Sequence, residues 1–394
     1  MSIPSAVVFG AGSVGRGFLG QLFSESGYEV VFVDIAEPIV AALSRARSYR
    51  LRLVDNSSTQ DISVHPVRAL HAEDTPRVCE ELARAHVAAT AVGTRALSSI
   101  APSVAAGIEL REKHGIGAAL NIIVCENLKD AAGVFRSRVD ELLSPGARSY
   151  AREYVGFINT VVGRMIPPQE AGVRAGDAGL VVAEPYKVLP VDARGFKGPI
   201  PNVVGMKPCE EFAVYMSRKL WIHNCAHAML GYLGYLRGYA YCHEALRETT
   251  ILRVVELSLR ESQCGIAAAH HVSEEWLRDH VTDLLRRFGN ASLKDSVARL
   301  GRDPLRKLGP SDRLVGAARL TESTGVRPEG LSWGIAAGYC FDCPDDPLAR
   351  SLQGLISTKG IAAAMLEVSS IRPDETLGGL VLDRYHLLRT GRWS

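Results

Sequence analysis

Residues 6–17 read AVVFGAGSVGRG, an apolar strand that runs directly into the spacing Gly-x-Gly-x-x-Gly. This spacing is typical of the turn that opens a dinucleotide-binding domain. In such a turn Gly10 allows the sharp bend, Gly12 the close approach of a pyrophosphate, and Gly15 the packing of the next helix on the sheet. The segment therefore predicts a Rossmann-type domain at the start of the chain.

An acidic residue follows at the distance that this domain requires. The apolar run 29–33 ends in Asp34, nineteen residues after Gly15, where a carboxylate accepts hydrogen bonds from the adenosine ribose. We expect the cofactor phosphates at the helix start, at Ser13 and Val14. No arginine in residues 35–37 would neutralise a 2′-phosphate, so NAD is favoured over NADP. A domain whose glycines only serve a turn is the alternative.

The composition indicates a globular protein that acts on small molecules. The 394 residues suffice for two or three domains, and 45 basic against 43 acidic residues leave a net charge of +2. So small a charge gives no field to gather nucleic acid or anionic membranes. The first strand leaves no room for a signal peptide, and eight scattered cysteines suit a reducing compartment. We expect a cytoplasmic monomer or homodimer without a membrane span.

Apolar strands alternate with helical stretches up to about residue 130. Further strands are expected at residues 87–92 and 119–125, and together they predict a parallel α/β sheet. Such sheets bind ligands outside the carboxyl ends of their strands. The residues there that we expect to line the cofactor site are Val92, Gly93, Glu126 and Asn127.

The pattern changes after a passage rich in Pro and Gly at residues 166–202, which includes a strand-like run at 180–183. Apolar residues then recur at helical spacing in the segments 210–237, 243–262, 273–287, 293–299, 333–339 and 346–359. We therefore expect an α/β Rossmann-type NAD-binding domain over residues 1–195 and an all-α substrate-binding domain over residues 196–394.

The densest polar cluster in an otherwise apolar helix is KLWIHNCAH at residues 219–227. Lys219, His223 and His227 share one helix face, and Asn224 is expected about 140° round from Lys219. One interpretation is a helix at a domain interface whose polar groups pair locally. The other is a hydride-transfer site, in which a lysine made basic by burial takes the hydroxyl proton and an amide stabilises the alkoxide.

Eight motifs spread along the chain resemble one enzyme family. They are FGAG (9–12), TAVG (90–93), NIIVCEN (121–127), VGF (155–157), IPP (166–168), FKG (196–198), RKL (218–220) and GRDPLRKL (301–308). The chain thereby resembles the polyol-specific long-chain dehydrogenases, the mannitol dehydrogenase family, over nearly its whole length. The resemblance implies a metal-independent enzyme whose substrate binds in a cleft between two domains.

The resemblance also assigns roles. The family pattern Lys-x4-Asn-x2-His matches Lys219, Asn224 and His227, which become the general acid/base, the oxyanion-hole donor and the substrate-orienting group. His223 lies outside this pattern and is interpreted as a packing residue.

Two residues depart from the family pattern. Asn159 stands where the phosphate-sugar members have Asp and the longer mannitol 2-dehydrogenases have Asn. It can donate to an alkoxide as Asn224 does, yet it weakens the assignment of a phosphorylated substrate. Gly163 replaces the Asp that precedes Arg164 and removes an expected partner of that arginine. The chain length nevertheless favours the phosphate-sugar branch.

Several basic residues of the helical half could hold a substrate phosphate. They are Arg302, Arg306, Lys307 and Arg313. A solvated charged face is the plainer interpretation, because phosphate recognition needs donors that converge. The pair Cys340 and Cys343 has no second ligand pair at metal-binding spacing, and we expect no metal.

Together these observations lead us to expect an NAD-dependent dehydrogenase that interconverts a hexitol phosphate and a ketose phosphate, with mannitol 1-phosphate and fructose 6-phosphate as the pair. Lys219 would transfer the proton while Asn159 and Asn224 polarise the oxygen. A dehydrogenase for an unphosphorylated polyol or a hexuronate is the alternative that Asn159 favours. A non-catalytic NAD(H) sensor is the other, and the set of Lys219, Asn224 and His227 argues against it.

Overall fold

The computed structural model describes residues 3–167, 177 and 179–393, so Pro168 of the IPP motif lies outside the described residues. The chain forms two compact units, Met1–Phe212 and Ala213–Ser394. This division comes later than the junction expected near residue 195. The reason is the parallel pairing of β10 (Leu189–Asp192) with β11 (Met206–Cys209), which holds the intervening segment to the first unit.

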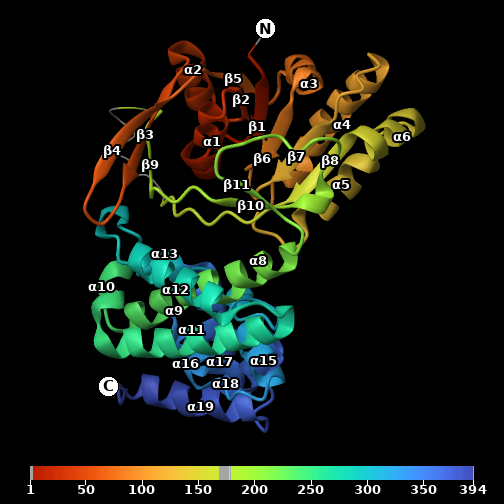
Figure 1. The fold of residues 1–394 in the computed structure, drawn as a ribbon. Helices are drawn as coiled ribbons and strands as arrows, with labels where there is room; N and C mark the ends of the chain where they lie inside the picture. Colours follow the sequence, from red (N-terminus) through yellow and green to blue (C-terminus); the bar gives the residue numbers. More distant parts are fainter. Residues whose placement is uncertain (1–2, 168–176, 178, 394) are drawn as a thin grey trace. The chain divides into compact units, whose positions relative to one another are not determined.

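The first unit is built on a six-stranded parallel sheet with the order β5-β2-β1-β6-β7-β8 (Figure 1). Its strands are β1 (Ser5–Phe9), β2 (Glu29–Asp34), β5 (Val67–His71), β6 (Val87–Thr90), β7 (Leu120–Val124) and β8 (Val155–Asn159). The order reverses between β1 and β6, as in a doubly wound fold. The register pairs Phe9 with both Val33 and Thr90, and Val124 with both Thr90 and Asn159. Five strand ends therefore lie along one edge of the sheet.

Both faces of this sheet are covered, which explains the continuous apolar runs in its strands. Successive side chains of a strand point to opposite faces, so Ala6 and Val8 belong to one core and Val7 and Phe9 to the other. The first core is closed by η1 (Gly15–Leu19), α1 (Gly20–Glu25) and α2 (Glu37–Ala46). The second is closed by α3 (Thr75–Arg84), α4 (Leu97–Lys113), α5 (Ala131–Asp140) and α6 (Pro145–Tyr154).

A smaller sheet has the order β4-β3-β9. The hairpin of β3 (Tyr49–Val54) and β4 (Thr59–Val64) is antiparallel, and β9 (Val181–Ala183) joins β3 in parallel. The strands expected at 6–9, 30–33, 87–92 and 119–125 are present in the main sheet, whereas the run at 180–183 belongs to this smaller one. The hairpin has no continuous apolar run because β4 is largely exposed, so the sequence analysis did not predict it.

The second unit is helical, as expected. Its longer elements are α8 (Phe212–Arg218), η3 (Lys219–Asn224), α9 (Cys225–Leu236), α11 (Thr249–His270), α12 (Glu274–Phe288), α15 (Val315–Ser323), α16 (Glu329–Cys340), α17 (Pro347–Lys359), α18 (Ile361–Ser369) and α19 (Thr376–Arg389). The shorter helices are α10 (Cys242–Arg247), η4 (Ala291–Leu293), α13 (Val297–Gly301) and α14 (Pro304–Lys307). Nearly all residues of α9 and α16 are buried. These two helices therefore form the centre of the unit.

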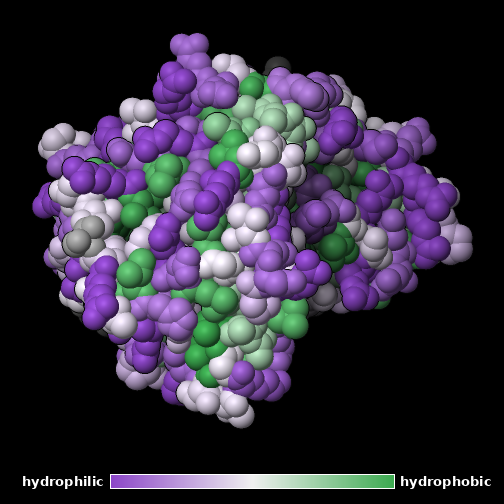
Figure 2. Space-filling model, turned by 90° about the horizontal axis from the view of Figure 1, so that it is seen from below, coloured by the Kyte–Doolittle hydropathy of each residue, from purple (hydrophilic) through white to green (hydrophobic). Residues whose placement is uncertain are grey.

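The face drawn in Figure 2 mixes hydrophilic side chains with separate groups of hydrophobic ones. Among the exposed large hydrophobic residues of the second unit are Leu348 in α17 and Leu366 in α18. Within the described residues, no helix is long and apolar enough to cross a membrane.

The close packing of η1 against the strand end predicts that Gly15→Ala destabilises the first unit. A Cβ at Gly15 would lie 1.9 Å from the carbonyl oxygen of Gly10, and relieving such an overlap costs roughly 1–3 kcal/mol. Hydrogen-exchange mass spectrometry should show faster exchange in β1 and β2. Gly12→Ala is the matched control, because a Cβ at Gly12 meets nothing within 4 Å, and its exchange should equal that of the wild type. Equal exchange in both variants would contradict this account.

Candidate active site

The glycine-rich turn forms the end of β1 in the way the sequence predicts. Gly10 has a φ of +99°, and a Cβ there would lie 2.4 Å from the carbonyl oxygen of Ala91. The helix begins at Ser13, and Gly12, just before it, is exposed. Space next to the Gly12 backbone is open, since a Cβ would meet no atom within 4 Å. This turn therefore leaves room for a ligand at a helix N-terminus, where backbone N–H groups favour phosphate.

Asp34 lies at the end of β2 and is joined to the glycine-rich turn. Its Oδ2 accepts a hydrogen bond from the Ala11 N–H at 2.6 Å, and its Oδ1 accepts one from the Ala36 N–H at 2.8 Å. A carboxylate has about four acceptor positions, so two remain for ribose hydroxyls. The side chain is half-buried, which leaves it accessible from the strand-end edge.

Glu126 follows β7, and its carboxylate is buried and bonded to a neighbouring loop. It is 8% exposed, and its Oε1 accepts a hydrogen bond from the Val92 N–H at 2.9 Å. Burial raises the pKa of Glu126, while hydrogen bonds from Val92, Thr90 and Gly93 act in the opposite direction. The side chain therefore holds the loop after β6, whereas Gly93 and Asn127 are exposed at the same edge.

Asn159, at the end of β8, is engaged locally. Its Oδ1 accepts a hydrogen bond from the Ala132 N–H at 3.0 Å, and its Nδ2 donates to Asp130 Oδ1 at 2.9 Å. Asp130 is the N-cap of α5 and has a φ of +50°. An amide suits this position because it both donates and accepts. The sequence analysis missed Asp130, whose contact with Asn159 spans 29 residues.

Arg164 has partners although the Asp expected before it is Gly163. Its guanidinium donates to Gln21 Oε1 at 2.7 Å and to the Gly17 carbonyl at 2.8 Å. It also donates to the Tyr186 carbonyl at 2.5 Å. The arginine is buried and connects η1 and α1 with the segment before β10. Backbone carbonyl and side-chain amide oxygens thus accept hydrogen bonds from Arg164 in the absence of that Asp.

In the second unit, residues Lys219–Asn224 form a π-helix between α8 and α9. The hydrogen bond of a π turn joins residues five apart, whereas that of an α turn joins residues four apart. Asn224 therefore follows Lys219 on the same helix face. The expectation that Asn224 lies about 140° away from Lys219 is wrong, because it assumed an unbroken α-helix.

The two histidines of this segment are packed against each other. The rings of His223 and His227 are 5.1 Å apart and nearly perpendicular, and His227 stacks on Phe288 at 4.1 Å. Burial, followed by the nearby charge of Lys219, holds the pKa of both histidines well below the ordinary value. Both imidazoles are therefore neutral.

The four basic candidates for a phosphate separate into two pairs. Lys307 and Arg313 are buried, whereas Arg302 and Arg306 are exposed. Lys307 Nζ donates to the Leu300 carbonyl at 2.5 Å. Burial, with a contribution from Arg313 and Arg306, lowers the pKa of Lys307 to about 7.

Carboxylates accompany two of the arginines in this segment. Arg306 is 2.8 Å from Asp303, and Arg313 is 2.7 Å from Asp312. The segment is therefore a mixed charge cluster in which two arginine side chains face solvent.

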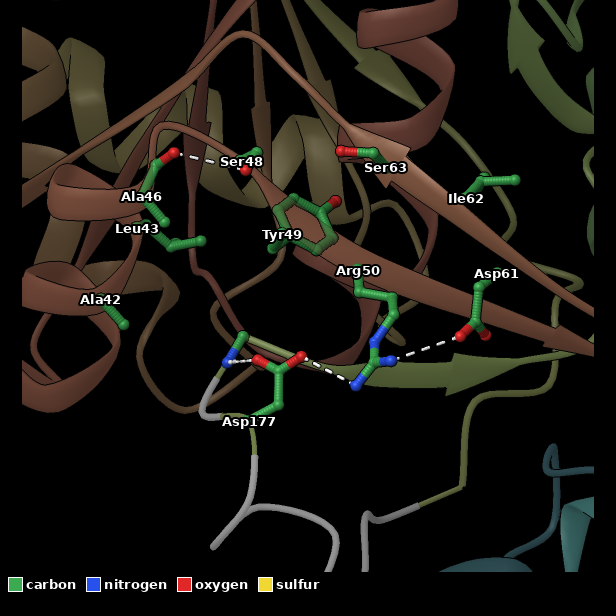
Figure 3. A pocket seen from close by; sticks show the side chains of 11 residues that line it. Ala42, Leu43, Ala46, Ser48, Tyr49, Arg50, Asp61, Ile62, Ser63 and Asp177 are labelled. Atoms are coloured by element: carbon green, nitrogen blue, oxygen red, sulfur yellow. Dashed lines mark hydrogen bonds and ion pairs between the residues drawn. The ribbon is translucent and has the colours of Figure 1, made fainter.

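A cavity of about 520 Å³ in the first unit lies away from these residues. Its lining comes from α2, Ser48, the β3–β4 hairpin, Asp177 and Gly179 (Figure 3). Arg50 bridges Asp61 and Asp177 there, at 3.4 and 3.2 Å. None of the residues expected to bind cofactor or substrate lines this cavity.

Among the residues described, no group of three or more His, Cys, Asp or Glu could hold a metal ion. The eight cysteines are free, and Cys340 and Cys343 are both buried.

The comparisons with known proteins agree with this architecture. Residues 4–205 match the Rossmann domain of mannitol dehydrogenases, and residues 211–371 match their C-terminal domain. The chain belongs to the mannitol dehydrogenase family and is an oxidoreductase.

Two relatives of similar length are both mannitol-1-phosphate 5-dehydrogenases. The chain is 35% identical to a mannitol-1-phosphate 5-dehydrogenase of Bacillus licheniformis, over 96% of this chain and 98% of that protein. It is 34% identical to that of Geobacillus stearothermophilus, over 98% and 100%. The similarity covers both units.

Solved structures share the fold at low identity. Pseudomonas fluorescens mannitol 2-dehydrogenase, in a ternary complex with NAD and D-mannitol, superposes with a TM-score of 0.78 at 19% identity, covering 99% of this chain and 93% of that one. A substrate-free D-sorbitol dehydrogenase gives 0.82 at 16% identity, covering 99% and 94%.

The contact of Asn159 with Asp130 predicts that Asn159→Asp destabilises the end of β8. Two carboxylates would stand where an amide now donates at 2.9 Å, at a cost of about 1–2 kcal/mol near a protein surface. The penalty should be largest near neutral pH and should disappear in acid, where one carboxylate takes up a proton. Hydrogen exchange at the start of α5 measures it. Asn159→Ala, which loses the same hydrogen bonds without added charge, should show a loss that does not depend on pH.

The buried ammonium of Lys307 predicts a pH-dependent stability difference from Lys307→Met. The pKa falls from 10.5 to about 7 on folding, so between these values the unfolded chain binds more protons. As the pH is raised through this range, the free energy of unfolding of the wild type should therefore rise relative to that of the variant, by up to about 1.4 kcal/mol per pH unit.

Urea titrations at about pH 7 and pH 9 test this difference. Tryptophan fluorescence reports the second unit alone, because the tryptophans are Trp221, Trp276, Trp333 and Trp393. A constant difference between wild type and variant would mean that Lys307 keeps its ordinary pKa.

Proposed function

We propose that the protein is an NAD-dependent dehydrogenase that reversibly converts a hexitol phosphate, mannitol 1-phosphate, into a ketose phosphate, fructose 6-phosphate. The observation that carries the proposal is the π turn at Lys219–Asn224. It aligns a lysine and an amide on one face of a helix in a chain that belongs to the mannitol dehydrogenase family. The 31–35% identity to mannitol-1-phosphate 5-dehydrogenases supports the choice of substrate.

NAD is the cofactor that the strand-end edge of the first unit suits best. The open space at Gly12 accommodates a pyrophosphate, and the free acceptor positions of Asp34 suit ribose hydroxyls. A carboxylate at that position also disfavours a 2′-phosphate. When bound, the nicotinamide supplies the hydride that the reaction exchanges with carbon. The other residues assigned to the cofactor are Gly10, Ser13, Val14, Gly15, Val92, Gly93, Glu126 and Asn127.

Lys219 transfers the proton in this proposal. In the reducing direction its ammonium protonates the developing alkoxide, and in the oxidising direction the free amine accepts the hydroxyl proton. Asn224, on the same helix face, donates to the alkoxide oxygen. His227 is neutral and orients a substrate hydroxyl by a hydrogen bond, since the pKa of His227 lies too low for it to act as the acid.

Asn159 is assigned as a second amide donor. One of its N–H bonds is used by Asp130, and an amide nitrogen carries two. Its local partners give a reason for Asn at this position that does not depend on the substrate. The argument for an unphosphorylated polyol is therefore weaker than the sequence suggested.

Arg302 and Arg306 are the phosphate-binding residues in this proposal, because both are exposed. Lys307 and Arg313 are buried, and they bind the Leu300 carbonyl and Asp312 within the protein instead. We assign the enzyme to the cytoplasm, where eight free cysteines stay reduced.

The substrate choice is tested by NADH consumption with fructose 6-phosphate and with fructose, using purified protein without added metal. We expect kcat/KM to favour the phosphate ester by roughly 100-fold or more, because charge-assisted hydrogen bonds from arginine to a phosphate are strong and fructose cannot form them. Turnover of fructose alone would indicate an unphosphorylated polyol. Turnover of neither, and of no uronate or pentulose, would favour a sensor.

Lys219→Ala tests the proton-transfer role in the same assay. Turnover should fall by roughly 100- to 10,000-fold, while NADH affinity measured by fluorescence titration stays unchanged. Lys359→Ala is the matched control, because this exposed lysine pairs with Glu367 on the surface, at 2.7 Å. Full turnover in Lys219→Ala would exclude the assigned role.

A further inference from the structure

We propose that Asp295 is a positioning residue, whose carboxylate holds the imidazole of His227 in one orientation and one tautomer for the substrate. The role of the oriented imidazole rests on the proposed function. The contact between Asp295 and His227 lies within the helical unit and can be tested without any substrate.

The edge of the His227 ring faces Asp295. His227 Nε2 is 3.8 Å from Asp295 Oδ2, and both side chains are largely buried. Among the described residues, Nε2 has no hydrogen-bond partner. A buried ring nitrogen without a partner costs free energy, and the nearby carboxylate is the acceptor that a small closing movement would supply.

Packing fixes the plane of the ring but not its proton. Phe288 stacks on His227 at an interplanar angle of 23°, and His223 meets it edge-on at 84°. These contacts leave a choice between protons on Nδ1 and Nε2. A carboxylate near Nε2 favours the proton there, which leaves Nδ1 as an acceptor for a substrate hydroxyl.

Asp295 is itself held from two sides. Its Oδ1 accepts a hydrogen bond from Arg299 Nε at 2.8 Å, which leaves Oδ2 toward His227. Its backbone carbonyl accepts from the Cys242 N–H at 2.8 Å, next to the bridge between Tyr241 and Ser296. The carboxylate is therefore oriented by one cation and anchored through its backbone.

Glycines of α9 allow this approach. His227, Gly231 and Gly234 stand at i, i+4 and i+7 and so share one face of the helix. A Cβ at Gly231 would lie 2.8 Å from the Gly301 backbone nitrogen, and one at Gly234 would lie 2.9 Å from Val297 Cγ1. Because α13 packs directly on these glycines, the segment that begins with Asp295 comes within reach of His227.

Burial is the largest influence on the pKa of both groups. It raises the pKa of Asp295, and Arg299 and Lys307 act in the opposite direction. Burial also holds the pKa of His227 well below its ordinary value, and the charges of Lys219, Arg299, Arg287 and Lys307 act in the same direction. The role proposed for the carboxylate is therefore to set the tautomer of a neutral ring, and not to exchange a proton with it.

The first test reads the tautomer directly. In protein labelled with ¹⁵N-histidine, long-range ¹H–¹⁵N spectra should show His227 with its proton on Nε2, the signal being assigned by its loss in His227→Gln. In Asp295→Asn the population should shift toward the Nδ1 proton. A wild-type His227 with its proton on Nδ1 would overturn the proposal, even if Asp295→Asn fails to fold.

The second test is a double-mutant cycle with whichever substrate the wild type turns over. Asp295→Asn should lower kcat/KM roughly 10- to 100-fold and change the KM for NADH by less than about twofold. In a His227→Ala background the same substitution should cost less than about twofold, because its effect passes through the histidine. Additive losses would overturn the proposal.

Glu261→Gln is the matched control. Glu261 is a buried carboxylate of the same unit, and it accepts hydrogen bonds from the N–H groups of Gly330 and Leu331. This substitution should alter stability without moving the His227 spectrum. If no sugar phosphate or polyol is turned over, the proposed function fails, and the spectrum still decides the role of Asp295.

Discussion

The first unit depends on one constraint: the backbone of residues 10–15 packs so closely on its neighbours that two positions have no room for a side chain. A side chain at Gly15 would overlap the Gly10 carbonyl, and one at Gly10 would overlap Ala91. Through these contacts η1 packs directly on the end of β1, and the glycine-rich turn packs on the loop after β6. Asp34 and Glu126 then complete the edge by accepting N–H groups from those same loops. The residues that position one another here are thus the residues assigned to the cofactor.

Each unit inserts a π turn where a ligand is expected. In the first, η1 follows the glycine-rich turn at once, and in the second, η3 carries Lys219 and Asn224. A π turn has poorer hydrogen-bond geometry than an α turn and survives where surrounding packing supports it. All of η1 and half of η3 are buried, and this packing supplies that support. The extra residue per turn changes which side chains share a face, and so changes the chemistry that a helix can present.

Burial and neighbouring charge decide the protonation of several groups in the helical unit. Burial keeps His223 and His227 neutral, and Asp295 is occupied by Arg299. Lys307 is sequestered against the Leu300 carbonyl. The division of labour proposed for Lys219, as proton carrier, and His227, as orienting group, follows from these surroundings and not from the residue types alone.

The sequence by itself determined the Rossmann-type unit, the helical unit and the segment of α8 to α9 that carries Lys219, because strand alternation, glycine spacing and helical periodicity are local. It did not reveal β8 as a strand with Asn159 bound to Asp130, the π turn that moves Asn224 beside Lys219, or the approach of Asp295 to His227. These depend on contacts between residues far apart in the chain. Only packing brings such residues together, and no local pattern records the distance between them.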